Sequence, residues 1–329
     1  MMTFNARRAG LAGVGILALT FALGTGPAHA QDKLIVAKSV GTAYTFLPID
    51  VGERAGIWKK NGLALEVKVF NGAAQAMQAL TAGTIEIGLN SGPSLAFIVK
   101  GVPAKGISAF GAEPLNMALA VSPASGITKV EDLKGKKIAV TTAGSLTDWM
   151  ANETSRRQGW KGADAIQVVP LGATRTRLAA MRRGEVAGHV TTTEQSYQHE
   201  FDGSGKLILL FGTVVPDFIT HVHFAHNDAI AKRPDVLRRF LKAWYETIAY
   251  MKSHRSETVD AAVAILKLDR SVLDRAYDPN VKMLDVDGRF DPKALKVLSR
   301  SFVDLKLLDK EPDMSALYTE QFLPARPMN

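Results

Sequence analysis

The residues of this sequence that could bind a ligand stand where apolar, strand-like runs end. The stretch Asn90-Ser91-Gly92 follows the run TIEIGL and precedes the apolar run SLAFIV. Its backbone amides, hydroxyl and side-chain amide can all form hydrogen bonds. The stretch around Ser94 lacks the second glycine of a nucleophile elbow, and no base can be assigned to that serine. These residues predict a site that holds a ligand by hydrogen bonds and contains no catalytic residue.

Five further strand-like runs end in residues of the same kind. The six exits are residues 39–42, 71–73 and 90–92 in the first half, and 141–145, 172–174 and 191–193 in the second. Each exit leads into a predicted helix, whose first turn carries unpaired amide donors and a partial positive charge. Small residues there would let an anion reach the amides. Such residues are also ordinary helix caps, but their recurrence in matching positions favours a binding cleft.

An internal repeat predicts the elements that position these exits. Residues 65–94 align with residues 166–195, and residues 35–46 with 138–149, in the order strand, turn, helix and strand. Short apolar strands that alternate with helices are typical of parallel βαβ units. The repeat therefore predicts two similar α/β lobes, over about residues 33–119 and 136–215. In open parallel sheets the ligand crevice lies beyond the carboxyl ends of the strands, where all six exits would meet.

The first 30 residues have the pattern of a secretory signal peptide. Arg7 and Arg8 precede an apolar run at residues 11–23, and Ala28-His29-Ala30 is a cleavage pattern before Gln31. The arginine pair leaves general secretion and twin-arginine export both open. The 329 residues contain no cysteine, which excludes disulfides and a lipid-attachment cysteine. We expect a soluble periplasmic protein without a lipid anchor.

The charge pattern does not favour a nucleic-acid partner. The net charge is +8, and two of the 40 basic residues lie in the predicted signal peptide. The remaining basic residues are scattered, with no run interleaved with aromatic residues.

Several motifs place the sequence near a known family. The stretches AGIWKKNGL, ALTAGTIEIG and VEDLKGKKIAV resemble those of the periplasmic solute-binding proteins of nitrate, sulfonate and taurine ABC importers. That family shares its fold with thiamine-pyrimidine-synthase-like proteins. The resemblance implies a type II periplasmic-binding-protein fold, with two α/β lobes joined by two crossing strands, at residues 116–122 and 218–226. It further implies that residues 31–119 and 221–329 form lobe one and residues 120–220 form lobe two.

The resemblance also implies the ligand contacts. Carried onto this sequence, and with the last strand exit added, they are Ser39, Thr42, Tyr44, Gly72, Ala73, Asn90, Ser91, Thr142, Gly144, Ser145, Thr174 and Thr192. Tyr44 and Trp149 could either stack on the solute or belong to the core, and Arg175 could either clamp an acid group or lie in solvent. If Asp148 and Glu194 point inward, zwitterionic and heterocyclic solutes stay open beside sulfonate, carboxylate and nitrate.

By the same resemblance, the protein is a monomeric receptor that delivers a small solute to the permease of an ABC importer, without a cofactor. Two alternatives stay open, namely a receptor for a sensor protein and a pyrimidine-forming enzyme. His221, His223 and His226 have a spacing that a metal could use, but no cysteine or clear carboxylate completes it, so no metal site is predicted. The stretch DVDGRFD has its glycine in the wrong place for a calcium loop and predicts a turn, with Asp291 capping the next helix.

Overall fold

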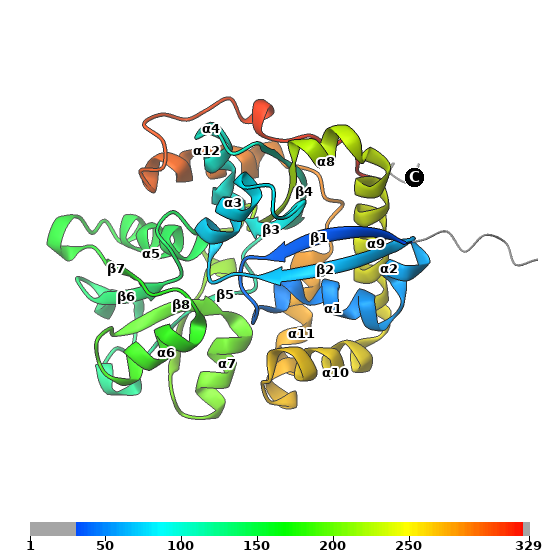
Figure 1. The fold of residues 1–329 in the computed structure, drawn as a ribbon. Coiled ribbons are helices and arrows are strands. Elements are labelled where there is room, and N and C mark those ends of the chain that lie inside the picture. Colours follow the sequence, from blue (N-terminus) through cyan, green and yellow to red (C-terminus); the bar gives the residue numbers. More distant parts are fainter. Residues whose placement is uncertain (1–30, 325–329) are drawn as a thin grey trace, which may run out of the picture. The chain divides into compact units, whose positions relative to one another are not determined.

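The strands of this protein form two five-stranded sheets (Figure 1). The computed structural model describes residues 31–324, and they lie in the single compact unit that begins at Gln31. The predicted signal peptide lies outside the described residues, and its cleavage stays a prediction. No helix between residues 31 and 324 is long and apolar enough to cross a membrane.

The first sheet has the strand order β2-β1-β3-β10-β4. Its strands are β1 (Asp32–Lys38), β2 (Leu63–Val69), β3 (Ile87–Ser91), β4 (Ala104–Gly111) and β10 (His221–His226). Strand β1 runs parallel to β2 and β3, whereas β10 is antiparallel to β3 and β4. All five residues of β3 are buried, including the polar residues Asn90 and Ser91 at its carboxyl end.

The second sheet repeats this arrangement, with the order β7-β6-β8-β5-β9. Its strands are β5 (Met117–Val121), β6 (Lys137–Val140), β7 (Gln167–Pro170), β8 (Gly188–Thr192) and β9 (Lys206–Leu210). Strand β6 is parallel to β7 and β8, and β5 is antiparallel to β8 and β9. The predicted repeat of two α/β units is therefore confirmed. The parallel pairing within each predicted βαβ unit is confirmed as well. In each sheet one strand from outside the unit, β10 in the first and β5 in the second, inserts in the antiparallel direction.

The chain changes sheet twice. It leaves the first sheet after β4, enters the second at β5, and returns between β9 and β10. The two predicted crossing segments hold β5 and β10, and each of these strands belongs to one sheet only. The connections lie just before them, at residues 112–116 and 211–220. Strand β5 spans the expected boundary between residues 119 and 120 but belongs wholly to the second sheet, so the exact lobe boundaries stay a prediction.

Helices follow most of the strands. In the two repeated units they are α1 (Leu47–Arg54), α2 (Ile57–Lys60), α3 (Ala73–Thr81), α4 (Ala96–Val99), α5 (Leu146–Arg157), α6 (Thr174–Arg182) and α7 (Thr193–Phe201), with the 3-10 turns η1 (Tyr44–Phe46) and η2 (Gly92–Leu95). The exit after β3 therefore leads first into a four-residue 3-10 turn rather than directly into an α-helix. Pro93, near the start of that turn, has no amide hydrogen and therefore cannot continue the backbone hydrogen bonding of strand β3.

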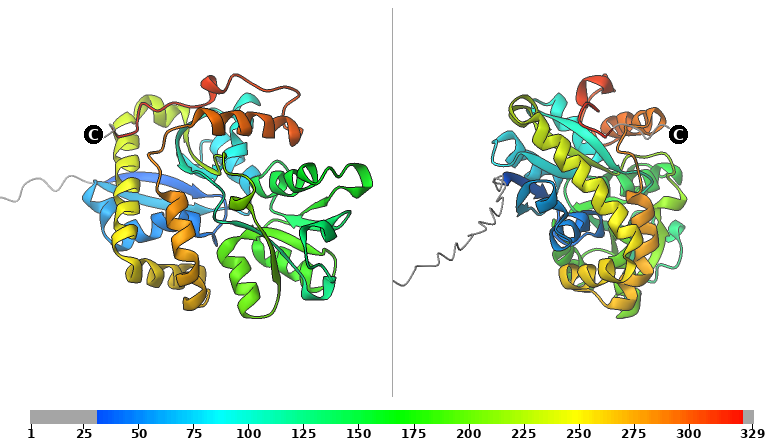
Figure 2. Two further views of the ribbon diagram at one scale, coloured as in Figure 1. Left: turned by 180° about the vertical axis from the view of Figure 1, so that it is seen from behind. Right: turned by 90° about the vertical axis from the view of Figure 1, so that its right-hand side faces the viewer.

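The remaining chain is helical, as its apolar spacing predicts. It forms α8 (Asn227–Lys232), α9 (Pro234–Ser253), α10 (Arg255–Leu266), α11 (Arg270–Leu284) and α12 (Pro292–Asp304). The long helix α9 packs on α1 and α2 (Figure 2). Its Phe240 stacks on Trp58 of α2, with 5.4 Å between the ring centroids. Asp291 caps α12 as predicted, because its carboxylate accepts from the amides of Lys293 and Ala294 at 2.8 and 3.0 Å.

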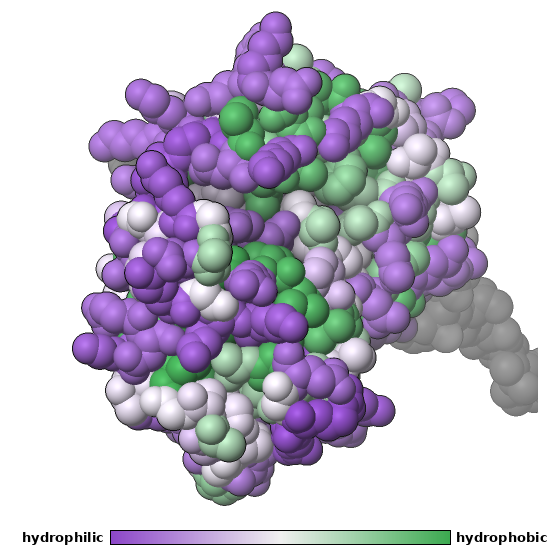
Figure 3. Space-filling model, turned by 90° about the vertical axis from the view of Figure 1, so that its left-hand side faces the viewer, coloured by the Kyte–Doolittle hydropathy of each residue, from purple (hydrophilic) through white to green (hydrophobic). Residues whose placement is uncertain are grey.

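The buried apolar side chains of residues 31–324 form two large clusters and two small ones. Hydrophilic residues cover much of the face in Figure 3, with smaller groups of apolar residues between them. Among the described residues, the large apolar side chains that stay exposed are Val67, Val69, Val99 and Phe201.

Candidate ligand-binding site

A cavity of about 70 Å³ lies where the strand exits of both sheets meet. Nine of the twelve predicted contact residues line it: Ser39, Thr42, Gly72, Ala73, Asn90, Ser91, Ser145, Thr174 and Thr192. Residues that were not among the predicted ligand contacts complete the lining, among them Arg177, His221 and Asn116. The exits converge because β1, β2 and β3 are parallel in one sheet, as are β6, β7 and β8 in the other.

The other three predicted residues lie at contacts that join the two sides of the cavity. The amide of Tyr44 donates to Glu194 Oε1 at 2.9 Å. A Cβ atom added to Gly72 would lie 2.6 Å from Thr142 Cγ2 across the cavity rim, and one added to Gly144 would lie 2.6 Å from Leu307 Cδ2. These glycines therefore allow a close approach that any side chain would prevent.

Two of the lining side chains form hydrogen bonds with residues on their own side of the cavity. The Asn90 amide donates to the Ala73 carbonyl at 3.0 Å and accepts from the Ser91 amide at 2.9 Å. Ser145 Oγ caps α5 by accepting from the Asp148 amide at 3.3 Å, and it lies 2.9 Å from the hydroxyls of Thr141 and Thr147. Both side chains shape the cavity wall, and Ser145 also has the capping role that was the simpler expectation.

Arg177 is a buried cation in the cavity wall. Its side chain is 3% exposed, whereas Arg175, which was singled out from the sequence, is exposed. The guanidinium donates to the carbonyls of Gly172 and Val190, and to Thr174 Oγ1 at 3.0 Å. No ion pair among the described residues includes Arg177. Its position three residues after Thr174, on the same helical face, was the available signal in the sequence.

The charges near the cavity differ in whether they have partners. Burial lowers the pKa of Arg177 to about 10, so the side chain stays protonated at neutral pH. Burial raises the pKa of Asp148, which accepts from the Gly144 amide and from Asn152 Nδ2, both at 2.8 Å. Burial also raises the pKa of Glu194, which is held by the Tyr44 amide. Asp148 and Glu194 therefore already accept hydrogen bonds from neutral donors. Arg177 donates only to neutral acceptors, so no acidic side chain balances its charge.

His221 faces the cavity from the first sheet. Its ring lies 5.5 Å from the rings of both Phe46 and Phe110, between centroids, and its buried Nδ1 has no hydrogen-bond partner among the described residues. Burial lowers its pKa to about 3, so the imidazole is neutral at physiological pH. His223 lies instead among Phe110, Phe240 and Trp244. Within residues 31–324, no three potential metal ligands gather in one place.

Tyr44 and Trp149 belong to the core, which was one of the two interpretations of their sequence. Tyr44 is fully buried, and Trp149 stacks on Phe218 at 4.3 Å between centroids. Neither lines the cavity.

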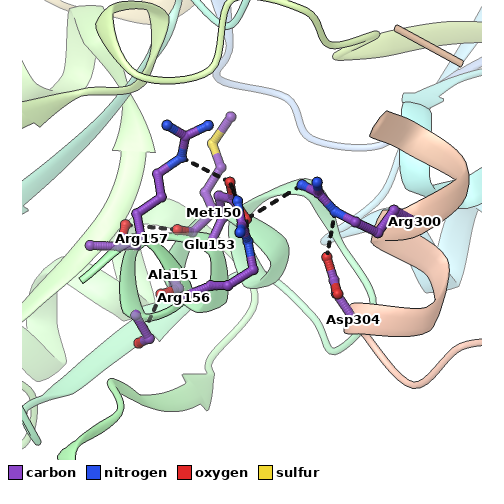
Figure 4. Close-up of polar contacts among 9 residues, drawn as sticks. Met150, Ala151, Glu153, Arg156, Arg157, Arg300 and Asp304 are labelled. Atoms are coloured by element: carbon purple, nitrogen blue, oxygen red, sulfur yellow. Dashed lines mark hydrogen bonds and ion pairs between the residues drawn. The ribbon is translucent and has the colours of Figure 1, made fainter. Parts of the chain in front are cut away.

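A cluster of charged residues joins α5 to α12 away from the cavity (Figure 4). Glu153 is 2% exposed and accepts from Arg156 at 2.6 Å and from Arg157 at 2.8 Å, and Arg300 of α12 lies 3.8 Å from it. Burial alone would raise the pKa of Glu153, but hydrogen bonds and the charges of Arg156 and Arg157 outweigh burial and leave the pKa lowered. The carboxylate therefore stays ionised and holds α5 beside α12.

Comparison with known proteins matches residues 44–258 to the family described as NMT1/THI5 like. The chain belongs to this family. It is 24% identical over 225 residues to a Brucella abortus protein named as a binding protein, covering 68% of this chain and 69% of that one.

Solved structures share its fold. The alkanesulfonate-binding protein SsuA from Xanthomonas axonopodis pv. citri bound to MOPS is 16% identical, with a TM-score of 0.71 over 87% of this chain and 96% of that one. The periplasmic nitrate-binding protein NrtA from Synechocystis PCC 6803 is 12% identical, with a TM-score of 0.74 over 89% and 87%. These likenesses confirm the predicted periplasmic-binding-protein fold.

Proposed function

We propose that this member of the NMT1/THI5-like family is a periplasmic solute-binding protein of an ABC importer that captures a small anion between two α/β lobes. The observation that carries the proposal is Arg177, a buried guanidinium that lines the cavity and forms no ion pair among the described residues. The family membership and the names of the structural neighbours, one binding alkanesulfonates and one nitrate, support the same function.

A buried, unpaired charge is costly, and a bound anion would remove that cost. Desolvating one ion costs several kcal/mol unless an opposite charge compensates it. The planar guanidinium suits carboxylate and other oxyanions because it can donate two parallel hydrogen bonds. Thr174 Oγ1 accepts from Arg177, which leaves its own proton free to donate to the ligand. Arg177 and Thr174 together form a polarised donor pair on the wall of the second sheet.

The wall of the first sheet supplies neutral donors. Gly72 precedes α3, and no acidic residue stands in the first turn of that nine-residue helix. The partial positive charge at its start is therefore not offset by a local carboxylate. Ser39, Thr42 and Ser91 add hydroxyls on the same wall. The ligand would be held from both sides, so binding would favour the closed arrangement of the lobes. The two connections between the sheets are the natural hinges.

Export and delivery complete the proposed function. The signal pattern of residues 1–30 supports transfer to the periplasm. There the protein, as a monomer, would hand its solute to the permease subunits of the importer. We propose binding without catalysis, because within residues 31–324 no hydroxyl of the cavity lining forms a hydrogen bond with His221, the lining residue that could act as a base.

A thermal-shift screen with anions, followed by calorimetric titration, tests the proposal. A bound anion should stabilise the protein by about 2.7 kcal/mol at a hundredfold excess over Kd. Arg177→Gln should weaken binding by roughly a hundredfold, since it removes hydrogen bonds to a charged ligand together with the balancing charge. Arg175→Gln, an exposed position on the same helix, is the matched control and should bind normally. The solute should be recovered chemically unchanged. Equal affinity of the two variants for every anion would contradict the proposal.

A further inference from the structure

We propose, building on the function above, that Glu194 is a positioning residue whose carboxyl group takes up one proton when the two sides of the cavity close, and so links solute capture to pH. The contact that Glu194 makes across the cavity rim, the lack of a cation beside it and two neighbouring oxygens without partners carry the inference. The proton comes from the solvent and converts the carboxylate into a neutral carboxylic acid.

Glu194 connects the two sides of the cavity. It stands in the first turn of α7, two residues after the lining residue Thr192, and it is fully buried. Its Oε1 accepts from the amide of Tyr44 at 2.9 Å, and Tyr44 opens η1 two residues after the lining residue Thr42. Asn280 of α11, a helix that packs on α9 and β4, also lies beside the carboxyl group. A side chain from the second side is thus enclosed by two elements of the first.

The carboxyl group has no positive partner. Among residues 31–324, no ion pair includes Glu194, and its Oε2 has no hydrogen-bond partner. Glu153 is buried to a similar degree, but Arg156 and Arg157 donate to it and keep it ionised. Burial raises the pKa of Glu194, and the hydrogen bonds that it accepts offset only part of that effect. An ionised Glu194 would be a buried charge without compensation, which is costly.

A proton would satisfy the atoms around the carboxyl group. Oε2 of Glu194 is buried without a partner, and so are two oxygens of its neighbours, Thr192 Oγ1 and Asn280 Oδ1. A carboxylate can only accept hydrogen bonds, whereas a carboxylic acid has a proton to donate to either oxygen. Protonation therefore supplies the missing donor, and Oε1 keeps the hydrogen bond from Tyr44.

The groups around this site do not supply a positive charge. The titratable and charged ones are Tyr44 of η1, Tyr277 and Asp274 of α11, Arg255 of α10, Glu113 in the connection before β5, His189 of β8 and Arg177 in the cavity wall. Arg255 pairs with Asp274 at 3.1 Å, and Arg177 donates to backbone carbonyls. Burial raises the pKa of both tyrosines and lowers that of His189, so all three are neutral. Burial and neutral hydrogen-bond donors dominate the pKa of Glu194.

The proton links binding to pH in one direction. When the sides are apart, water reaches the carboxylate, and the partial positive charge at the start of α7 favours its ionised form. Closure raises the pKa of the group, so the closed arrangement binds a proton that the open one releases. Solute affinity should therefore rise as the pH falls, by up to about tenfold per pH unit. The rise should end below the ordinary glutamate pKa of 4.5, where both arrangements are protonated.

Glu194→Gln tests the neutral state, because glutamine has the shape of a protonated glutamate, with an oxygen for the Tyr44 amide and a donor for its neighbours. The probes are nitrate and methanesulfonate, which stay ionised and contribute no proton, in calorimetric titrations from pH 6 to 8.5. Bis-Tris, imidazole and Tris are suitable buffers, because they are cations and do not compete for an anion site.

The wild type should bind each probe more weakly as the pH rises, and the ratio between the affinities of Glu194→Gln and wild type should grow by up to about tenfold per pH unit. At one pH, the heats in Bis-Tris and imidazole should reveal proton uptake by the wild type and none by the variant. Glu200→Gln is the matched control, since it removes the same charge from an exposed position of α7 and should keep the wild-type pH profile.

A crosslinked protein tests the proton without any solute. A Cβ atom added to Gly72 would lie 3.6 Å from Thr142 Cβ, which suits a disulfide, and the chain has no cysteine of its own. Oxidised Gly72→Cys/Thr142→Cys should hold the sides closed. By infrared titration, one carboxyl group should stay protonated to a higher pH in the oxidised than in the reduced protein, and adding Glu194→Gln should abolish that difference. Melting curves report whether the variant folds, and the calorimetric series does not depend on it.

Two results would overturn the inference and leave the proposed function standing. One is a ratio of affinities between Glu194→Gln and wild type that does not change with pH, and the other is the same carboxyl titration in the oxidised and reduced crosslinked protein. Failure of every anion to bind in the thermal-shift screen would overturn the proposed function instead, and the infrared titration would then decide alone whether Glu194 takes up a proton.

Discussion

Gly72 offers a direct test of whether the two sides of the cavity must close on the solute. Its backbone has φ 140° and ψ 166°, a conformation that is essentially restricted to glycine. An added Cβ would lie 2.6 Å from Thr142 Cγ2 and 3.4 Å from Thr142 Oγ1. Gly72→Ala should therefore have two separate effects, one on the backbone and one on closure.

The two effects can be estimated independently. Backbone strain should lower the free energy of unfolding by about 1–3 kcal/mol, with or without solute. On the proposed closure, the clash arises only when the two sides approach each other, and relieving it needs a shift of about 1 Å to reach ordinary van der Waals distance. Overpacking of this kind costs about 1–3 kcal/mol, which corresponds to a loss of affinity of roughly fivefold to more than a hundredfold.

A second substitution separates these effects. Thr142→Ser removes Cγ2 and leaves Oγ1 in place, so the double variant Gly72→Ala/Thr142→Ser should recover affinity but not folding stability. Gly83→Ala is the matched control, since Gly83 has φ 65° and an added Cβ would meet no described atom within 4 Å. It should lower the melting temperature without changing the affinity.

Calorimetric titration with the tightest-binding anion, together with melting curves of the unliganded proteins, measures both quantities. The reasoning would be refuted if Gly72→Ala kept the affinity of the wild type. It would also be refuted if the affinity stayed low in the double variant, because the methyl contact with Thr142 would then not be the cause.

Three further predictions follow from other parts of the molecule. Arg300→Gln removes the partly exposed contact between Arg300 of α12 and Glu153 of α5. Because this contact holds the two helices together, its loss should weaken solute binding, by less than about fivefold. The difference from the wild type should be smaller in 0.5 M salt, which titrations at two salt concentrations would measure. Burial lowers the pKa of His199 to about 4 and of His221 to about 3, so below about pH 6.5 the unfolded chain binds protons that the folded chain does not. Stability should therefore fall as the pH falls from 6.5 toward 4, by up to about 1.4 kcal/mol per pH unit for each histidine, and His199→Asn should reduce that slope in urea unfolding. The exported protein should begin at Gln31 by intact-mass analysis, and retention of residues 1–30 would contradict the signal-peptide interpretation.

Local sequence rules determined much of the fold. The repeated order of strand, turn and helix predicted two similar α/β units, since apolar runs and small-residue turns act over a few residues. The same rules predicted the cap at Asp291 and identified the strand exits that line the cavity. They left the directions of β5 and β10 undetermined, because the local pattern of a strand does not specify the strand beside which it inserts.

Only the tertiary structure decided which polar groups line the cavity. Arg175 and Arg177 stand two residues apart in the first turn of α6 with the same chemistry, yet packing against the carbonyl of Val190 buries Arg177 alone. His221 reaches the cavity because β10 pairs with β3 in a register that sets it beside Ser91, far away in the sequence. Gly72 meets Thr142 only when the two sheets are assembled. Contacts between distant segments depend on strand register and on the packing of whole elements, and these are set by the free energy of the complete fold rather than by neighbouring residues.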